Sequence, residues 1–234
     1  MTTHVGLRSG GWLMVASALT LVGYLVIALT IGADFEHDLE AAADRADVAV
    51  NQVATATQAR ITHDHALYAG LTAVFLFVPP LLLLLAVTAL RRALGGRTAT
   101  CAWWAALAAA VVWWAYDGLG LGLFADPDDL PPLVRDFGPL TVPMVTTLSL
   151  LATVAVALAA EAVRAGGVAR RAARVATVVS VLLAVLGVAG LVSSGYADPV
   201  PPIVVLPGAL VLGIAMVAAR RPAEERVAAA RRGS

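Results

Sequence analysis

The stretch Cys101–Phe124, CAWWAALAAAVVWWAYDGLGLGLF, decides the fold class of this 234-residue chain. It is long enough to cross the hydrocarbon core of a bilayer, since about 20 apolar residues at about 1.5 Å each span about 30 Å. Within it lies one acidic residue, Asp117, fourteen residues after Trp103. A helix therefore carries Asp117 about 21 Å beyond Trp103, roughly 9 Å inside the far interface. A polar group at that depth is costly, so Asp117 is the first candidate for a functional residue.

The composition of the whole chain indicates a membrane protein that crosses the bilayer several times. Hydrophobic residues make up 60% of the sequence and charged residues 14%, and the mean hydropathy is +0.84. A soluble domain has about 45–50% apolar and about 25% charged residues. All 16 basic residues counted are Arg, so chemistry that needs a lysine Schiff base is excluded. The single Cys, Cys101, excludes an intrachain disulfide and a thiolate metal cluster.

The apolar stretches predict an all-α polytopic bundle, a single membrane domain of six spans. The spans cover residues 12–32, 66–90, 101–124, 139–160, 175–192 and 203–219 approximately. The first span is longer than the roughly 7–15 apolar residues of a signal peptide, so we interpret it as retained. Pro79-Pro80 predicts a kink in the second span, because two backbone donors are missing. The alternating Gly118, Gly120 and Gly122 predict that the third span unwinds near Asp117.

The largest segment outside the predicted spans is residues 34–62, between spans one and two. Its apolar side chains recur at intervals of three and four residues: Phe35, Leu39, Ala42, Ala46, Val50 and Val53. This periodicity predicts one amphipathic helix. Because the apolar stripe is mostly Ala and Val, it is too weak to anchor firmly in lipid. We expect the helix to pack on the mouth of the bundle or on another subunit.

The arginines predict the orientation of the chain. With six spans, one side carries most of them: Arg8, the Arg91–Arg97 and Arg164–Arg174 clusters, and the arginines after residue 219. The other side holds only Arg45, Arg60 and Arg135, among nearly all the carboxylates. Since cytoplasmic loops carry the excess of Arg, we predict that both termini are cytoplasmic and that the amphipathic helix is extracytoplasmic. The Ala-, Val- and Arg-rich composition without Lys suggests a bacterial source, and hence a plasma (inner) membrane.

Two interpretations of Asp117 remain open. It could be an ion, proton or substrate ligand in an outward-facing polar cavity, or it could hydrogen-bond within a frayed helix end. The adjacent Trp113 and Tyr116 lie deeper than an interfacial aromatic belt, so they either line that cavity or pack in the core. Further candidates fall on one face of the fourth span: Thr146, Ser149 and Thr153. These hydroxyls could line a polar cavity or hydrogen-bond between helices.

A second, weaker candidate is the pair of imidazoles at His63 and His65, with Asp64 between them. An extended chain would let both bind a divalent transition metal. A helix would separate their side chains by about 200° and prevent chelation. The alternative is that they are titratable surface histidines close to a span.

The motif content argues against several enzyme classes. No His lies inside a predicted span, which argues against b-type haem and against a His-dependent intramembrane protease. The sequence contains no HExxH, P-loop or GxGxxG motif. We therefore expect no cofactor and no nucleic-acid partner, and we favour a role that is not enzymatic, without excluding an enzyme.

Three classes of function stay open after these exclusions. The first is an accessory, regulatory or structural subunit of a membrane complex, with the lipid bilayer and either further copies or other membrane subunits as partners. The second is a transport-related or substrate-binding protein with a cavity around Asp117, and the third is a lipid-modifying enzyme. A water-accessible cavity that reaches Asp117 would favour the second class. An outer helix whose apolar stripe is engaged by another chain would favour the first.

Overall fold

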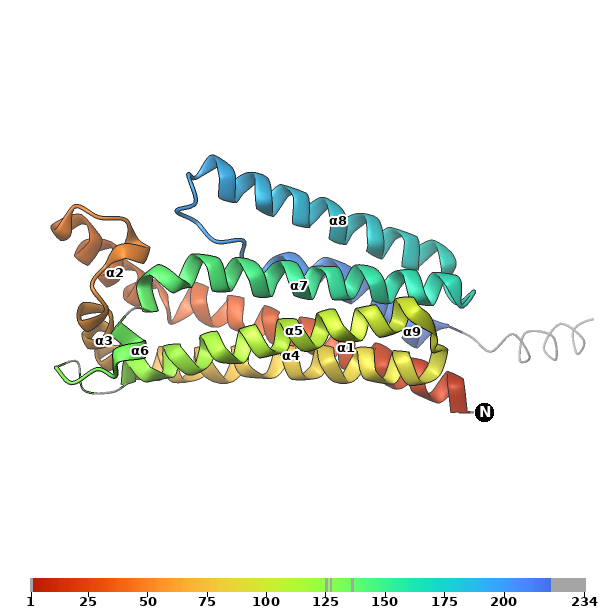
Figure 1. Cartoon of the computed structure of the whole chain (residues 1–234). Helices are drawn as coiled ribbons and strands as arrows, with labels where there is room; N and C mark the ends of the chain where they lie inside the picture. The colour runs from red at the N-terminus through yellow and green to blue at the C-terminus, as the bar shows by residue number, and fades with distance from the viewer. Residues whose placement is uncertain (1, 125, 127, 136, 220–234) are drawn as a thin grey trace, which may run out of the picture.

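The computed structural model describes the chain except residues 1, 125, 127, 136 and 220–234, and it is an all-α bundle (Figure 1). The long helices are α1 (Thr2–Thr30), α4 (Ala66–Leu94), α5 (Gly96–Leu121), α7 (Phe137–Ala165) and α8 (Arg170–Ser193). In the described part of the chain, these five helices contain segments long and apolar enough to cross a membrane, and Pro202–Ala218 is a shorter apolar helix. The protein is therefore a multi-pass membrane protein whose apolar helices contact lipid. The predicted arginine-rich tail lies outside the described residues.

The shorter helix completes a closed ring. It consists of the 3-10 turn η3 (Pro202–Val205) and α9 (Leu206–Ala218). Around the ring, α1 packs on α4, α4 on α5, α5 on α7, α7 on α8, α8 on α9, and α9 on α1. At the α1–α9 crossing, a Cβ on Gly11 would lie 2.8 Å from the carbonyl oxygen of Gly213, and a Cβ on Gly213 would lie 2.9 Å from that of Gly11. Glycine on both helices permits this close approach.

The end of the ring that holds the α4–α5 turn, called here the packed end, contains the tightest core. Gly95 and Gly96 make this turn with φ of 64° and 82°, a region that favours glycine. The helices meet here through small side chains and one large one that are almost fully buried: Ala86, Leu90, Ala102, Ala106, Ala155 and Ala159. Alanine at these positions lets the helix backbones approach closely.

The opposite end of the bundle, the cap end, is covered by a helical cap formed by residues 33–64 (Figure 1). The cap consists of α2 (Ala33–Ala46), the 3-10 turn η1 (Val50–Gln52) and α3 (Thr55–Asp64). A second short piece, α6 (Pro132–Arg135), lies at the same end (Figure 1).

The prediction of one continuous amphipathic helix over residues 34–62 is wrong. Asp47 adopts the left-handed conformation, with φ 52° and ψ 47°, and ends α2. Aspartate visits this region more readily than most residues do. The chain then turns back, so that Ala42, Ala43 and Val53 are buried together. Ala42 and Val53 of the apolar stripe are thus covered by their own chain, which one straight helix would not achieve, whereas Ala46 and Val50 stay exposed.

Two predicted weak points do not break their helices. Helix α4 runs from Ala66 to Leu94 through Pro79 and Pro80, and the Ser17 hydroxyl of α1 donates a 2.9 Å hydrogen bond to the Pro79 carbonyl. Helix α5 continues through Gly118 and Gly120 to Leu121, and the 3-10 turn η2 (Gly122–Phe124) follows it. The predicted unwinding near Asp117 is therefore wrong: a regular helix satisfies the backbone hydrogen bonds within an apolar span, which outweighs the low helix propensity of glycine.

Candidate functional site

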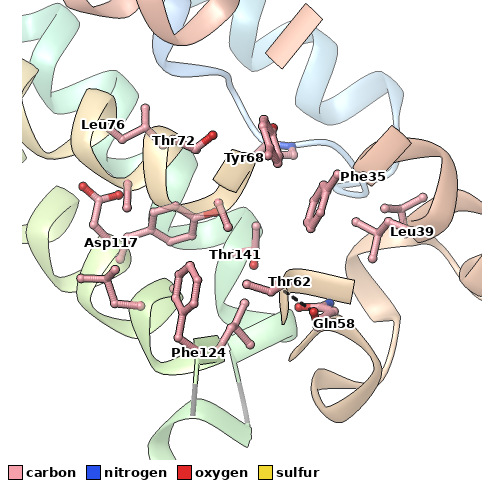
Figure 2. Close-up of a pocket in the computed structure, with 18 of the residues that line it drawn as sticks. Phe35, Leu39, Gln58, Thr62, Tyr68, Thr72, Leu76, Asp117, Phe124 and Thr141 are labelled. Carbon is pink, nitrogen blue, oxygen red and sulfur yellow. Dashed lines mark hydrogen bonds between the residues drawn. The ribbon is translucent and has the colours of Figure 1, made fainter. Parts of the chain in front are cut away.

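A cavity of about 460 Å³ lies between the cap and the cap end of the bundle (Figure 2). Its walls come from the cap, α4, α5 with η2, Thr141 of α7, and the connection between α8 and η3. Pockets that bind small molecules have volumes of about 300–1,000 Å³. The cavity is therefore large enough for a small ligand.

Helix α4 supplies one wall through a single helical face. Tyr68, Thr72 and Leu76 follow each other at intervals of four residues, and Ala69 and Ala73 line the cavity beside them. The Tyr68 ring packs closely on Gly32, where a Cβ would lie 2.5 Å from the ring. Glycine at the junction of α1 and α2 thus makes room for Tyr68 at the cavity wall.

Helix α5 supplies the wall that carries Asp117. Asp117 is only 6% exposed, and its Oδ2 is buried without a hydrogen-bond partner among the described residues. Tyr116 and Gly120 line the cavity beside it, and Gly120 adds no side chain that could fill the space. The phenols of Tyr24 and Tyr116 lie within electrostatic range of the carboxylate. Asp117 therefore sits in a regular helix at a cavity wall, with one carboxylate oxygen that accepts no hydrogen bond from the described residues.

The cap supplies the facing wall, so that Phe35 and Leu39 lie on the opposite side of the cavity from Asp117 (Figure 2). The Phe35 ring lies 5.1 Å from the Tyr68 ring, centroid to centroid. In α3, the Thr62 hydroxyl donates a 2.8 Å hydrogen bond to the Gln58 carbonyl. The Gln58 amide in turn donates to the Val53 carbonyl at 2.9 Å. These bonds connect the cavity wall to the turn of the cap.

The charged residues that line the cavity have one sign. Among the described residues that line it, Asp117 and Asp198 are acidic and none is basic. Asp198 and Val50 are exposed, so the cavity reaches the surface where these two residues lie. Exposed carboxylates are frequent on the neighbouring α2: Asp34, Glu36, Asp38, Glu40 and Asp44. The cavity and its surroundings therefore favour positive over negative ligands.

The two aromatic candidates from the sequence, Trp113 and Tyr116, lie in different surroundings. Tyr116 lines the cavity, whereas Trp113 is 2% exposed and packs in the main core. Trp114, between them in the sequence, donates a 3.1 Å hydrogen bond from its indole nitrogen to the Phe77 carbonyl of α4. Trp113 and Tyr116, three residues apart, share one face of α5 and differ in their position along the helix axis, whereas Trp114 points to another side.

The predicted hydroxyl face of α7 does not line the Asp117 cavity. Thr146 lines a second cavity of about 500 Å³ beside α7, where α8 diverges from α7 toward the cap end (Figure 1). Its hydroxyl accepts a 3.2 Å hydrogen bond from the Val200 amide. Thr153 donates to the Ser149 carbonyl at 2.7 Å within the helix. The Ser149 hydroxyl is buried without a hydrogen-bond partner among the described residues.

The two candidate metal ligands point to different neighbours. His63, near the end of α3, has its ring 6.5 Å from the Phe124 ring, whereas His65 lies 2.9 Å from the Asp38 carboxylate. His65 also meets the edge of Phe35 at 5.8 Å. Over the described residues, no group of three or more His, Cys, Asp or Glu side chains is placed to hold a metal ion. The contact of His65 with Asp38 instead joins α2 to the start of α4.

Several residues of the cavity were not among the sequence candidates. Tyr68 and Thr72 are the main ones on α4, and their spacing of four residues is a polar signal within an apolar span. In the sequence, Phe35 is distinguished only as part of an apolar stripe. Thr62 and Thr141 carry no distinguishing sequence pattern, because their role depends on which helices meet at the cap end.

Comparison of this chain with known protein families, curated proteins and solved structures finds no match. The chemistry of the site itself is therefore what indicates a function for this protein. That chemistry consists of a buried carboxylate with an unpaired oxygen, neighbouring hydroxyls and aromatic rings, and no basic side chain among the described lining residues.

Proposed function

We propose that this protein binds a small amphipathic molecule in the cavity between the cap and the bundle, as a substrate-binding or transport-related membrane protein. The observation that carries this proposal is Asp117, which lines the cavity with a buried, unpaired carboxylate oxygen. Ligand sites combine mostly apolar walls with a few polar groups that orient the ligand. Here Leu39, Leu76 and Phe124 belong to the apolar part, and Asp117 and Thr72 to the polar part.

Two features favour binding over a purely accessory role. A buried polar group without a partner is costly, and such residues in membrane proteins commonly serve a substrate or ion pathway. In addition, the apolar stripe of the cap packs on its own chain through Ala42, Ala43 and Val53. The cap therefore buries the centre of that stripe without another subunit, whereas Ala46 and Val50 stay exposed.

A test of the cavity compares two insertions of the same bulky side chain. Ala73→Trp places an indole in the cavity, whereas Val111→Trp is a matched control because Val111 is 56% exposed on α5. Native mass spectrometry of protein purified in nanodiscs from its source cells should detect a bound small molecule on the wild type and on Val111→Trp, and none on Ala73→Trp. Equal occupancy of all three proteins, or no bound molecule on any of them, would contradict the proposal.

We also propose the full topology of six spans, with both termini cytoplasmic and the cap on the outer side of a bacterial plasma membrane. Its support is the arginine distribution together with the place of α9 in the ring between α8 and α1. Since α9 with η3 is 17 residues from Pro202 to Ala218, its helical length approaches the lower limit of a span.

Cysteine labelling tests this topology in intact cells on a Cys101→Ala background. Single cysteines at Glu40 in the cap and at Asp128 should react with a membrane-impermeant reagent from outside. Cysteines at Arg97 and Arg170, at the packed end, should react only after the cells are permeabilised. Labelling of Arg97 or Arg170 positions from outside would refute the six-span topology.

A further inference from the structure

The charge of Asp117 has no counterpart in its cavity. Its Oδ2 is buried without a hydrogen-bond partner, and none of the described lining residues is basic. A carboxylate in such surroundings is stabilised by an opposite charge within about 4–6 Å. A ligand that brings a positive charge would therefore complete the site, whereas a neutral ligand would displace water and leave the charge without a partner.

The aromatic lining suits the same kind of ligand. Phe35, Tyr68, Tyr116 and Phe124 come from four different elements and line one cavity. Aromatic faces attract cations, and cages of such rings recognise quaternary ammonium groups. The remaining walls include Leu39, Leu76 and Leu123, which suit an apolar body.

A bare metal ion fits the cavity less well than an organic cation. Hard cations such as Ca²⁺ need six to eight oxygen ligands at about 2.3–2.6 Å. Among the described residues, no group of three or more His, Cys, Asp or Glu side chains is placed to hold a metal ion. The volume of about 460 Å³ also far exceeds that of a single ion and matches a small organic molecule.

We propose that the ligand of this cavity is an organic cation with an apolar body, whose positive group pairs with the Asp117 carboxylate and whose body contacts the aromatic rings of the cavity walls. This inference rests on the function proposed above and names the chemical class of its ligand. The acidic surface near the cavity, including Asp198 and the carboxylates of α2, raises the local concentration of such a cation.

The test uses two probes of similar size and shape on the full chain in phosphatidylcholine nanodiscs. One is phenylbutyl-trimethylammonium, which is permanently charged, and the other is N,N-dimethyl-phenylpentanamide, which is neutral. Binding is measured by equilibrium titration against nanodiscs without protein. The variants are Asp117→Asn and Ala73→Trp, and Asp128→Asn is a matched control because Asp128 is exposed and does not line the cavity.

We expect the wild type and Asp128→Asn to bind the cationic probe about ten- to hundredfold more tightly than the neutral one. Asp117→Asn should lose this preference while still binding the neutral probe, because the amide keeps the shape of the side chain but not its charge. The comparison of the two probes on the wild-type protein needs no variant, so it decides the question even if a substituted protein does not fold.

The outcomes separate this inference from the proposed function. If both probes bind the wild type with equal affinity and Ala73→Trp blocks both, the cavity is a binding site but the cation inference is wrong. If neither probe binds the wild type in a saturable way, both this inference and the proposed binding function fail for ligands of this size.

Discussion

Helix α5 contributes to both ends of the bundle, and its two halves differ in what they bury. At the packed end it buries alanines, such as Ala102 and Ala106, in the main core. At the cap end it presents Tyr116, Asp117 and Gly120 to a cavity. Helix α4 repeats the contrast, with Leu90 fully buried at one end and Tyr68 lining the cavity at the other.

The contrast teaches where this protein can accommodate a ligand. Close packing of small side chains leaves little freedom for a helix to shift, because protein interiors have few voids. The cap end instead leaves a carboxylate without a partner, which a fold selected only for stability would remove. We infer that the packed end holds the helices in place while the cap end carries the site.

The largest effect should come from truncating a large side chain of the packed end. Changing Leu90, which is 0% exposed, to Ala should cost about 2–5 kcal/mol of stability, because it leaves a void that its neighbours fill only in part. Leu121 at the cap end is 45% exposed, so Leu121→Ala should change stability by no more than about 0.5 kcal/mol. Thermal unfolding in detergent measures both, and equal losses would show that the two ends are packed alike.

Enlarging a small side chain should also distinguish the two ends: it should lower the stability of the protein at the packed end and leave it nearly unchanged at the cap end. Ala106→Leu adds bulk to the packed core and should destabilise the protein by about 1–3 kcal/mol. Ala73→Leu adds the same bulk to a cavity wall and should be tolerated, since space is available there. The same unfolding assay applies, and a strongly destabilised Ala73→Leu would mean that the cavity is closed in solution.

Removing the unpaired carboxylate should stabilise the protein. Asp117→Leu should raise the free energy of unfolding by about 1–3 kcal/mol, because it removes a buried polar group that lacks a partner. Asp117→Asn is the matched variant, and its stability should stay close to that of the wild type because size and polarity are retained. A lower melting temperature for Asp117→Leu would instead indicate that the carboxylate has a structural partner.

The smallest effect concerns two glycines. A Cβ on Gly118 of α5 would meet no atom within 4 Å, so Gly118→Ala should stabilise the helix by about 0.5–1 kcal/mol. Gly213→Ala should destabilise the protein, because a Cβ there would meet the Gly11 carbonyl oxygen at 2.9 Å. If both substitutions changed the melting temperature in the same direction, the close α1–α9 crossing would be in doubt.

The features predicted well from the sequence were those that depend on short stretches of chain. Long apolar runs predicted the helices, and the depth of Asp117 in one of them identified it before any tertiary contact was known. The periodicity of residues 34–62 correctly predicted helix and wrongly predicted continuity. The reversal at Asp47 gains its stability from contacts such as Ala43 with Val53, and periodicity cannot report contacts that form only after a turn.

The sequence alone is therefore sufficient to predict membrane insertion. The free energy of placing a side chain in lipid depends mainly on that residue and not on its tertiary contacts. The cavity was decided only by the tertiary structure. Phe35, Tyr68, Asp117 and Asp198 lie far apart in the sequence and line one space because the cap folds over the ends of α4 and α5. The same packing places Thr146 of α7 at a different cavity, although Thr141 of the same helix lines this one. Which polar side chains share a cavity depends on helix rotation and neighbour order, and the apolar pattern of each span leaves both open.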